Sequence, residues 1–222
     1  MSALSSAEIA SWNRTLATLA PEDIVRWALR TAGDRAVVST NFRPYEAVLL
    51  HLVTRQRADI PVLWVDHGYN RPATYHHAEA LRRQLGLNVK PYLPLLTAAH
   101  RDALHGPIPT PADEAALREF SHLVKIEPFR RGMRELAPRV WLTSLRRSQN
   151  AGRATFAHVS WDENFGVIKV NPLLDWDDAQ MDAYLAAHGL PNEFDYFDPA
   201  KADEKRECGL HAAWAAAPGG QR

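Results

Sequence analysis

Apolar segments of strand length alternate along this chain with segments that repeat apolar residues at helical spacing. The strand-like segments are Ala36–Ser39, Ile60–Val65, Leu87–Leu93, Val140–Leu145 and Val167–Val170. Helical patterns cover Pro44–Gln56, Ala73–Leu85, Pro128–Leu136 and Asp177–His188, and Gly86 and Gly189 stand in the usual stop positions. This alternation predicts an α/β fold, a three-layer sandwich in which a mostly parallel, Rossmann-like sheet has helices on both faces.

Patterning along the chain divides it into two parts. Residues His100–Ala112 are rich in proline and glycine and are predicted to form a loop. Regular patterning fades after Leu190, and the residues that follow are mostly polar. We therefore expect one α/β domain over residues 1–190 and a flexible C-terminal tail over residues 191–222.

Composition excludes several classes of protein. The 26 basic and 26 acidic residues balance, so no overall field favours nucleic acid or a membrane surface. No apolar run has the length of a membrane span, and residues 1–18 lack a secretory signal pattern. The single cysteine excludes an internal disulfide and any four-thiolate zinc or iron–sulfur site, and the 10 histidines are too scattered to predict a metal site. The expected location is a reducing cytoplasm.

The loop after the first strand is a candidate binding site, because parallel sheets bind ligands beyond the carboxyl ends of their strands. Ser39, Thr40 and Asn41 lie there, just before the first helix. Hydroxyl, amide and backbone N–H groups at the positive end of a helix suit an anion such as phosphate or sulfate. The same residue types are also the preferred N-caps, so capping alone is the alternative.

Basic residues follow the strand Val140–Leu145. Arg146, Arg147 and Arg153 lie in this loop, and guanidinium groups bind phosphate oxygens two at a time. The three arginines are therefore suited to bind a polyanion. The alternative interpretation is an ordinary basic loop exposed to solvent. Lys125 is a further candidate cation, although a lone lysine is more often a surface residue.

Asp66 and Gly68 directly follow the apolar strand Ile60–Val65. An acid at the carboxyl end of such a strand often contacts the ribose or base of a nucleotide. Helix capping with a tight turn at Gly68 is the alternative. Together with the preceding loops, this one indicates a nucleotide that carries several anionic groups and lies above a parallel sheet.

The only cysteine, Cys208, lies in the charged run Lys205-Arg206-Glu207-Cys208-Gly209-Leu210-His211. Structural cysteines usually behave as small buried hydrophobes, but this stretch offers little apolar surface to bury one. A thiol beside Lys, Arg and His is suited to act as a thiolate nucleophile. An incidental surface cysteine is the alternative.

Six motifs resemble, in order, those of phosphoadenylyl-sulfate (PAPS) reductases, over about residues 35–211. The motifs are Val38–Phe42, Ile60–Tyr69, Lys125–Pro128, Leu145–Gln149 with Arg153, Val170–Trp176 and Glu207–His211. The Glu-Cys-Gly-Leu-His motif is the most specific of them, and the first loop is a degenerate form of the pyrophosphate-binding (PP) loop of adenine-nucleotide enzymes. The resemblance implies the adenine nucleotide alpha hydrolase-like fold.

The resemblance also implies a function, thiol-dependent reduction of PAPS to sulfite and adenosine 3′,5′-bisphosphate in assimilatory sulfate reduction. Cys208 would be the nucleophile. The implied substrate-binding residues are Ser39, Thr40, Asn41, Asp66, Gly68, Lys125, Arg146, Arg147, Arg153 and His211. One cysteine cannot release its own S-sulfonate, so an external dithiol, thioredoxin or glutaredoxin, is the expected partner. The family is also compatible with a homodimer.

Related adenylyl-sulfate (APS) reductases hold a [4Fe–4S] cluster with two pairs of cysteines. Phe120 and Ser121 stand here in place of the first pair, and a second pair is missing. We therefore expect no iron–sulfur cofactor, which favours PAPS, with cluster-free reduction of APS as the alternative.

One departure from the family leaves two other functions open. The stretch Pro191–Lys205 lacks the usual Gly-Asp-x-His-Thr-Thr element, which motivates a non-catalytic nucleotide binder. The second alternative is an ATP-using PP-loop enzyme. Such enzymes usually keep a Ser-Gly-Gly-x-Asp-Ser loop, whereas Phe42 and Arg43 stand in the place of glycine here.

Overall fold

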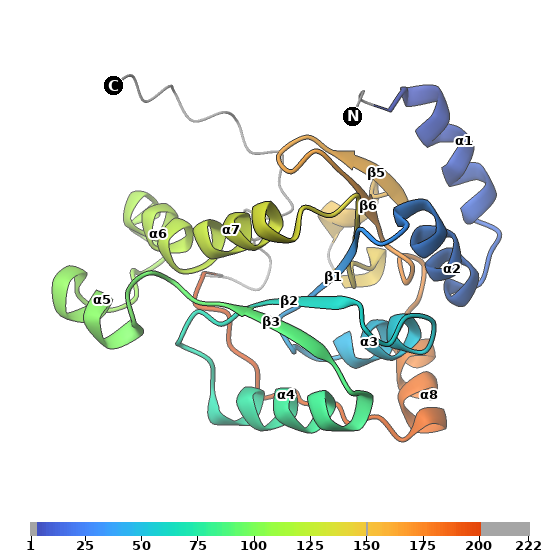
Figure 1. Ribbon diagram of the computed structural model, residues 1–222. Helices are drawn as coiled ribbons and strands as arrows, with labels where there is room; N and C mark the ends of the chain where they lie inside the picture. Colours follow the sequence, from blue (N-terminus) through green and yellow to red (C-terminus); the bar gives the residue numbers. More distant parts are fainter. Residues whose placement is uncertain (1–3, 150, 201–222) are drawn as a thin grey trace.

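The computed structural model describes residues 4–149 and 151–200, and within that range six strands form one sheet. The strands are β1 Ala36–Thr40, β2 Pro61–Val65, β3 Asn88–Tyr92, β4 Val140–Leu142, β5 Val159–Asp162 and β6 Val167–Val170. Their order across the sheet is β3-β2-β1-β4-β6-β5, and every pair is parallel except β5 with β6 (Figure 1). The mostly parallel α/β sheet predicted from the sequence is confirmed.

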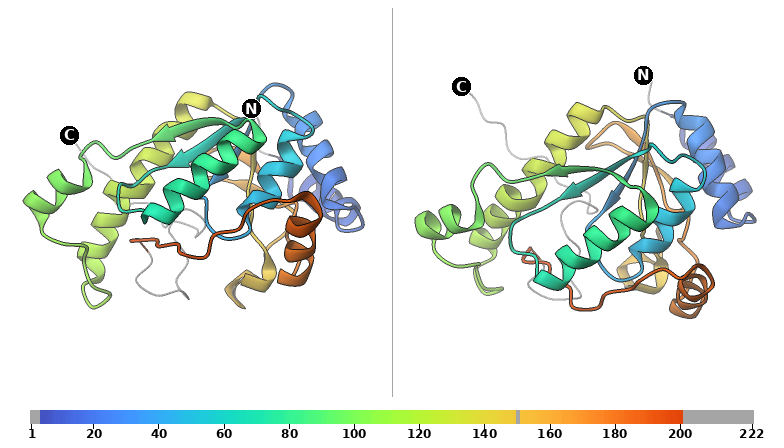
Figure 2. Two further views of the ribbon diagram at one scale, coloured as in Figure 1. Left: turned by 90° about the horizontal axis from the view of Figure 1, so that it is seen from below. Right: turned by 60° about the horizontal axis from the view of Figure 1, so that its bottom comes forward.

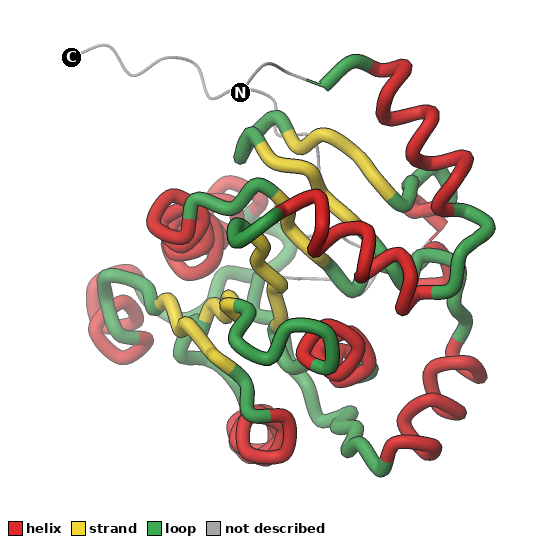
Figure 3. The backbone as a smooth tube through the Cα atoms, turned by 45° about the vertical axis from the view of Figure 1, so that its right-hand side comes forward, coloured by secondary structure: helices red, strands yellow, loops and turns green. Residues whose placement is uncertain are grey.

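Helices cover both faces of this sheet (Figure 3). They are α1 Ser6–Leu16, α2 Pro21–Ala32, α3 Glu46–Thr54, α4 Pro72–Leu85, α5 Ala98–His105, α6 Glu114–Ser121, α7 Glu127–Leu136 and α8 Asp178–His188. A π-helix, η1 His122–Ile126, joins α6 to α7, and two 3₁₀ turns, η2 Arg147–Gln149 and η3 Ala151–Arg153, follow β4. Helices α2, α3, α4 and α8 pack on one face and α7 on the other, which gives three layers.

The two faces of the sheet contribute to separate cores because side chains alternate along a strand. Val38, paired with Val62 and Leu142, faces the helical layer of α2 and α3. The neighbouring residues Val37 and Trp141, which are also paired, face α7, and both are fully buried. The apolar strands recognised in the sequence therefore form the central layer of the molecule.

Gly132 allows α7 to lie close to the sheet. A Cβ atom at this position would stand 2.9 Å from Leu63 Cδ1 and 2.9 Å from ring carbons of Tyr92. Because overpacking a core costs about 1–3 kcal/mol, Gly132→Ala should lower the free energy of unfolding by that amount in urea titrations. Arg134→Ala, an exposed position on the same helix, should change it by less than about 0.5 kcal/mol. Equal effects of the two changes would contradict the close packing at Gly132.

The segment His100–Ala112 is only partly a loop, so that prediction was wrong. Helix α5 covers Ala98–His105, and Thr97 caps it by accepting the N–H of His100 at 3.2 Å. Arg101 is its one buried residue, so the helix lacks the apolar stripe that helical periodicity detects. Helices α1, α2 and α6 and the edge strand β5 were not predicted either.

The π-helix ends at Ile126, two residues before Pro128. Proline cannot donate the backbone hydrogen bond that an α-helix needs, and π-helical turns often accommodate such interruptions at functional positions. The wider turn carries Lys125, which is only 3% exposed. Lys125 is therefore an interior residue, against the alternative that it is a surface lysine.

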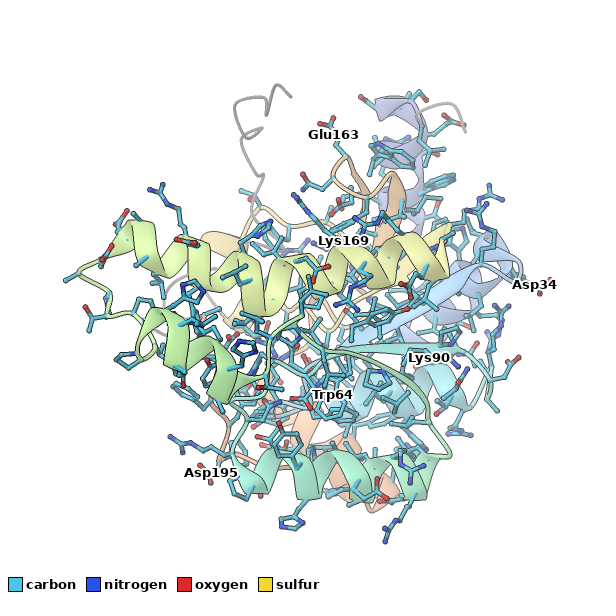
Figure 4. All side chains as sticks on the ribbon, turned by 60° about the vertical axis from the view of Figure 1, so that its left-hand side comes forward. Asp34, Trp64, Lys90, Glu163, Lys169 and Asp195 are labelled. Carbon is cyan, nitrogen blue, oxygen red and sulfur yellow. The ribbon has the colours of Figure 1, made fainter. Side chains whose placement is uncertain are left out.

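Residues 191–200 extend from α8 past α4 toward the carboxyl ends of the central strands (Figure 2). Asn192 Oδ1 accepts the N–H of Tyr45 at 2.8 Å. Asp195 lies beside the first turn of α4 (Figure 4) and forms an ion pair with Arg71, the residue before that helix. Within the described part of the chain, this segment therefore packs on the α/β domain.

Candidate functional site

A polar pocket opens at the carboxyl ends of β1 and β4. These two strands are neighbours in the sheet. The chain runs from β1 to β2 and β3 on one side of β1 and then returns to form β4 on its other side, so the strand order reverses between β1 and β4. Ligands of open α/β sheets bind at this kind of switch point. The polar lining comprises Ser39, Thr40, Asn41, Arg43 and Glu46 near β1, Thr143 and Ser144 after β4, and Arg153, Tyr196 and Asp198.

The loop after β1 binds the carboxylate of Glu46, in the first turn of α3. Glu46 Oε2 accepts hydrogen bonds from Thr40 Oγ1 and Asn41 N, both at 2.7 Å. Its Oε1 accepts from Arg43 Nε and Ser144 Oγ, both at 3.0 Å. The loop was predicted to surround an anion, and in this structure that anion is a side chain of the protein itself.

The backbone of this loop takes conformations that are usual for glycine. Phe42 has φ 54° and Tyr45 has φ 72°, which costs a non-glycine residue about 1–3 kcal/mol. Packing holds both residues in place. Phe42 is buried edge-on against Trp64, with ring centroids 5.0 Å apart, and Trp64 lies between the sheet and α4 in Figure 4. Ser39 is fixed as well, since its Oγ accepts the indole N–H of Trp141 at 2.8 Å.

Lys125 and Asp198 form a buried ion pair beside the pocket, with side chains 3% and 6% exposed. Burial by itself raises the pKa of Asp198, but the charge and hydrogen bond of Lys125 outweigh it, so this pKa lies below its ordinary value. Tyr196, two residues earlier, also lines the pocket, and burial raises the pKa of its phenol. Lys125 thus lies next to the pocket residue Asp198, which supplies its counter-charge from residues 191–200.

His67 is buried close to this ion pair. Burial, followed by the Lys125 charge, lowers the pKa of His67 from 6.5 to about 4. The ring Nδ1 accepts the N–H of Tyr69 at 3.1 Å, a role that requires the neutral imidazole. The folded chain therefore resists protonation of His67 more than the unfolded chain does.

Lowering the pH should destabilise the fold through His67. Between about pH 6.5 and pH 4, His67 is protonated in the unfolded chain but not in the folded chain. The free energy of unfolding should therefore fall by on the order of 3 kcal/mol as the pH is lowered across this window. His67→Asn keeps an acceptor for Tyr69 but cannot titrate, and should show a shallower loss. Urea unfolding at several pH values checks this, and parallel pH profiles of the two proteins would contradict it.

The three predicted arginines occupy different surroundings. Arg153 is 3% exposed, lines the pocket and donates to Gln149 Oε1. Arg146 is equally buried, donates to Asp178 Oδ1 at 2.7 Å and stacks on the ring of Tyr45. Arg147 pairs with Asp175 and donates to the carbonyl of Phe156 at 2.8 Å. Of the three, only Arg153 is part of the pocket lining.

Asp66 and Gly68 lie in the turn after β2, outside the lining of this pocket. Asp66 Oδ1 accepts the Gly68 N–H at 3.1 Å and the Tyr75 hydroxyl at 2.8 Å. Gly68 has φ 78°, a conformation that glycine adopts without strain. These contacts form the tight turn at Gly68 that was predicted from the sequence as the alternative to a contact with a nucleotide. Cys208 and His211 lie outside the described residues.

Several lining residues were not predicted. Glu46 has the appearance of an ordinary acidic residue in a first helical turn, and Asp198 and Tyr196 follow the last regular pattern. Thr143 and Ser144 could have been recognised in the sequence. They stand at the carboxyl end of β4, as Ser39 and Thr40 stand at the carboxyl end of β1. Among the described residues no group of three His, Cys, Asp or Glu side chains is arranged to hold a metal, and no described helix is long and apolar enough to cross a membrane.

Comparison with protein-family models matches residues 35–194 to the family described as phosphoadenosine phosphosulfate reductase domain. Among curated proteins, the phosphoadenosine 5′-phosphosulfate reductase of Xanthomonas campestris pv. campestris (strain B100) is 37% identical over 221 residues, which covers 90% of each chain. The protein of the same name from Xylella fastidiosa (strain 9a5c) is 35% identical, covering 92% of this chain and 94% of that protein.

Solved structures give a similar result. The phosphoadenylyl-sulfate (PAPS) reductase of Candida auris, crystallised as a phosphate complex, superposes with a TM-score of 0.75 at 27% identity and covers 86% of this chain and 90% of that chain. The FMN adenylyltransferase of Candida glabrata has a TM-score of 0.55 at 14% identity, over 86% of this chain and 61% of that chain. The second similarity shows the fold alone.

Proposed function

This chain belongs to the phosphoadenosine phosphosulfate reductase family, and we propose that it reduces PAPS to sulfite and adenosine 3′,5′-bisphosphate with electrons from an external dithiol. The observation that carries the proposal is the match of residues 35–194 to the family. The matched residues include most of the lining of the polar pocket at the ends of β1 and β4. The related Candida auris reductase was crystallised with phosphate, in keeping with an anionic substrate. The reaction would serve sulfate assimilation and cysteine biosynthesis in the cytoplasm.

The first chemical step is a nucleophilic substitution at sulfur. The Cys208 thiolate attacks the sulfur atom of the bound substrate, so that a sulfur–sulfur bond forms and the bond from that sulfur to the 5′-phosphate oxygen breaks. Adenosine 3′,5′-bisphosphate leaves with the electron pair, and Cys208 becomes an S-sulfonate. Residues 191–222 would be the segment that supplies this thiol to the domain.

The second step needs two thiols from outside the chain, since the sequence holds a single cysteine. One thiolate of the dithiol attacks Cys208 Sγ, and sulfite leaves with the electron pair. The second thiol then resolves the mixed disulfide and regenerates the Cys208 thiol. The dithiol supplies both electrons, and we propose thioredoxin or glutaredoxin for this role.

Buried cations stabilise the charge that develops on the leaving phosphate. Lys125 and Arg153 would serve this role, and substrate oxygens would replace Asp198 and Gln149 as their partners. Ser39, Thr40 and Asn41 would lie next to the phosphosulfate group. In this proposal Asp66 and Gly68 approach the adenosine, and Arg146, Arg147 and His211 complete the substrate-binding set.

APS is a second candidate substrate because the charges that line the pocket nearly balance. Glu46 is bound to Arg43, and Asp198 is paired with Lys125. APS lacks the 3′-phosphate and therefore needs fewer cations than PAPS.

Sulfite release from each nucleotide with reduced thioredoxin tests the proposal. We expect sulfite from PAPS and a slower reaction with APS. Faster turnover of APS would reassign the substrate. Nucleotide binding without sulfite, or release of pyrophosphate from ATP, would overturn the reductase function.

A further inference from the structure

The carboxylate of Glu46 occupies the place where the loop after β1 can bind an anion. Each of its oxygens accepts two hydrogen bonds, from Thr40, Asn41, Arg43 and Ser144. The side chain is 8% exposed and borders the pocket. It also lies in the first turn of α3, where the helix dipole favours negative charge. These donors are therefore already bound to a fixed negative charge.

A ligand group that approaches this loop meets an acceptor rather than a set of unoccupied donors. A carboxylate repels a second anion, and the repulsion grows with the charge of that anion. It has no proton to donate, so it can form a hydrogen bond only with a ligand group that carries one. Glu46 should therefore respond strongly to the charge of the terminal group of a bound nucleotide.

We infer that Glu46 is a specificity-determining residue that selects a singly charged sulfuryl terminus over a doubly charged phosphoryl terminus at this loop. The inference rests on the proposed function, because it needs the 5′-terminal group of the nucleotide to lie at Ser39–Asn41. The two termini have the same tetrahedral shape. A terminal phosphoryl group, like that of a phosphate monoester, carries about −1.5 to −2 charges near pH 7, with a second pKa of about 6, whereas a terminal sulfuryl group carries one negative charge. Shape alone cannot separate them, but a nearby carboxylate can.

Other charged and titratable groups face Glu46 from several elements. Arg43 binds it from the same loop, His77 faces it from α4, and Tyr196 and Asp198 belong to residues 191–200. Arg153 lines the same pocket. Burial lowers the pKa of His77, so His77 stays neutral near pH 7 and does not compensate Glu46.

The test measures binding to the full chain in a Cys208→Ser background, which prevents reaction. The ligands are PAPS and adenosine 3′-phosphate 5′-diphosphate, which differ only in the terminal sulfuryl or phosphoryl group. We expect the chain with Glu46 to prefer PAPS by at least about tenfold at pH 7.5. Its affinity for the phosphoryl ligand should rise as the pH is lowered to 5.5, where that ligand becomes singly charged, by more than its affinity for PAPS changes.

Glu46→Gln keeps the shape of the side chain and removes the charge. Its amide can donate to a phosphoryl oxygen, so the preference for PAPS should fall about tenfold, mainly because the phosphoryl ligand binds more tightly. Glu79→Gln, the same chemical change at a position on α4 whose side chain is 41% exposed, should leave the preference unaltered. Thermal melting checks that each variant folds.

Three results would overturn the inference. The first is equal affinity of the Glu46 chain for the two ligands. The second is a Glu46→Gln variant that folds but weakens both ligands by the same factor, which would indicate a purely structural residue. If Glu46→Gln does not fold, the test uses the affinity of the protein with Glu46 unaltered for the two ligands at different pH values. The third overturning result is an affinity that changes with pH in the same way for both ligands. Failure of both ligands to bind, together with absence of sulfite from the unaltered enzyme, would count against the proposed function instead.

Discussion

Cys208→Ser should abolish sulfite formation from PAPS, with a loss of roughly 10⁴-fold or more in rate. The expected size follows from removal of the nucleophile that forms the covalent intermediate, because a serine hydroxyl remains protonated and is a much weaker nucleophile at sulfur. The sequence contains no other thiol that could substitute for it. Initial rates of sulfite release with reduced thioredoxin, compared at equal protein concentration, measure the effect.

Binding of adenosine 3′,5′-bisphosphate is the control for this variant. The product should bind to Cys208→Ser about as tightly as to the unaltered chain, since the substitution changes one atom and the product lacks the sulfur that Cys208 attacks. Loss of product binding would indicate a damaged fold rather than a missing nucleophile. Sulfite release by Cys208→Ser at an undiminished rate would exclude the thiol mechanism.

Lys125→Met should destabilise the protein by about 3–5 kcal/mol, because it leaves the Asp198 carboxylate buried without its counter-charge. The double variant Lys125→Met with Asp198→Leu should recover most of this loss, since a buried ion pair can be exchanged for apolar groups at little cost. Sulfite formation should stay strongly reduced in both variants, because both lack the cation proposed to bind substrate. Urea unfolding and sulfite assays on the same preparations separate the two effects.

The Arg71–Asp195 ion pair provides a matched control. It also joins residues 191–200 to the domain, but its side chains are 52% and 49% exposed. Exposed pairs contribute about 0–1 kcal/mol, so Arg71→Met should change stability little. A loss of stability for Lys125→Met as small as that for Arg71→Met would contradict a buried pair, and full activity of Lys125→Met would exclude this lysine from the substrate site.

Periodicity was sufficient to predict five of the six strands of the sheet. The strands with continuous apolar runs, such as Ile60–Val65, have both faces covered by helices, and such runs are recognisable in a sequence. Helix α5 was missed because Arg101 is its only buried residue. The edge strand Val159–Asp162 has one buried residue, Val159, and so carries little apolar signal. Little apolar burial therefore explains why α5 and β5 were missed. It does not explain α2, which buries Ile24, Val25 and Leu29 and was missed although it carries an apolar face.

Residues that follow strands were the easiest part of the pocket to recognise in the sequence. Ser39, Thr40 and Asn41 line the pocket because the end of β1 is fixed by the parallel sheet, and their binding of substrate stays a prediction. The burial of Lys125 depends on a π-helix and on Asp198, which is 73 positions away in the sequence. The role of Glu46 depends on Ser144, 98 positions away. Such pairings arise from the tertiary structure and have no local sequence signal.

The mass of the intact protein after incubation with PAPS, without any dithiol, tests the proposed reaction most directly. We expect an adduct of about 80 Da on Cys208, the mass of one sulfonate, and its loss when reduced thioredoxin is added. The same experiment with Cys208→Ser should give no adduct. Sulfite production by a chain that never acquires this mass, under conditions that would trap it, would contradict a Cys208 S-sulfonate intermediate.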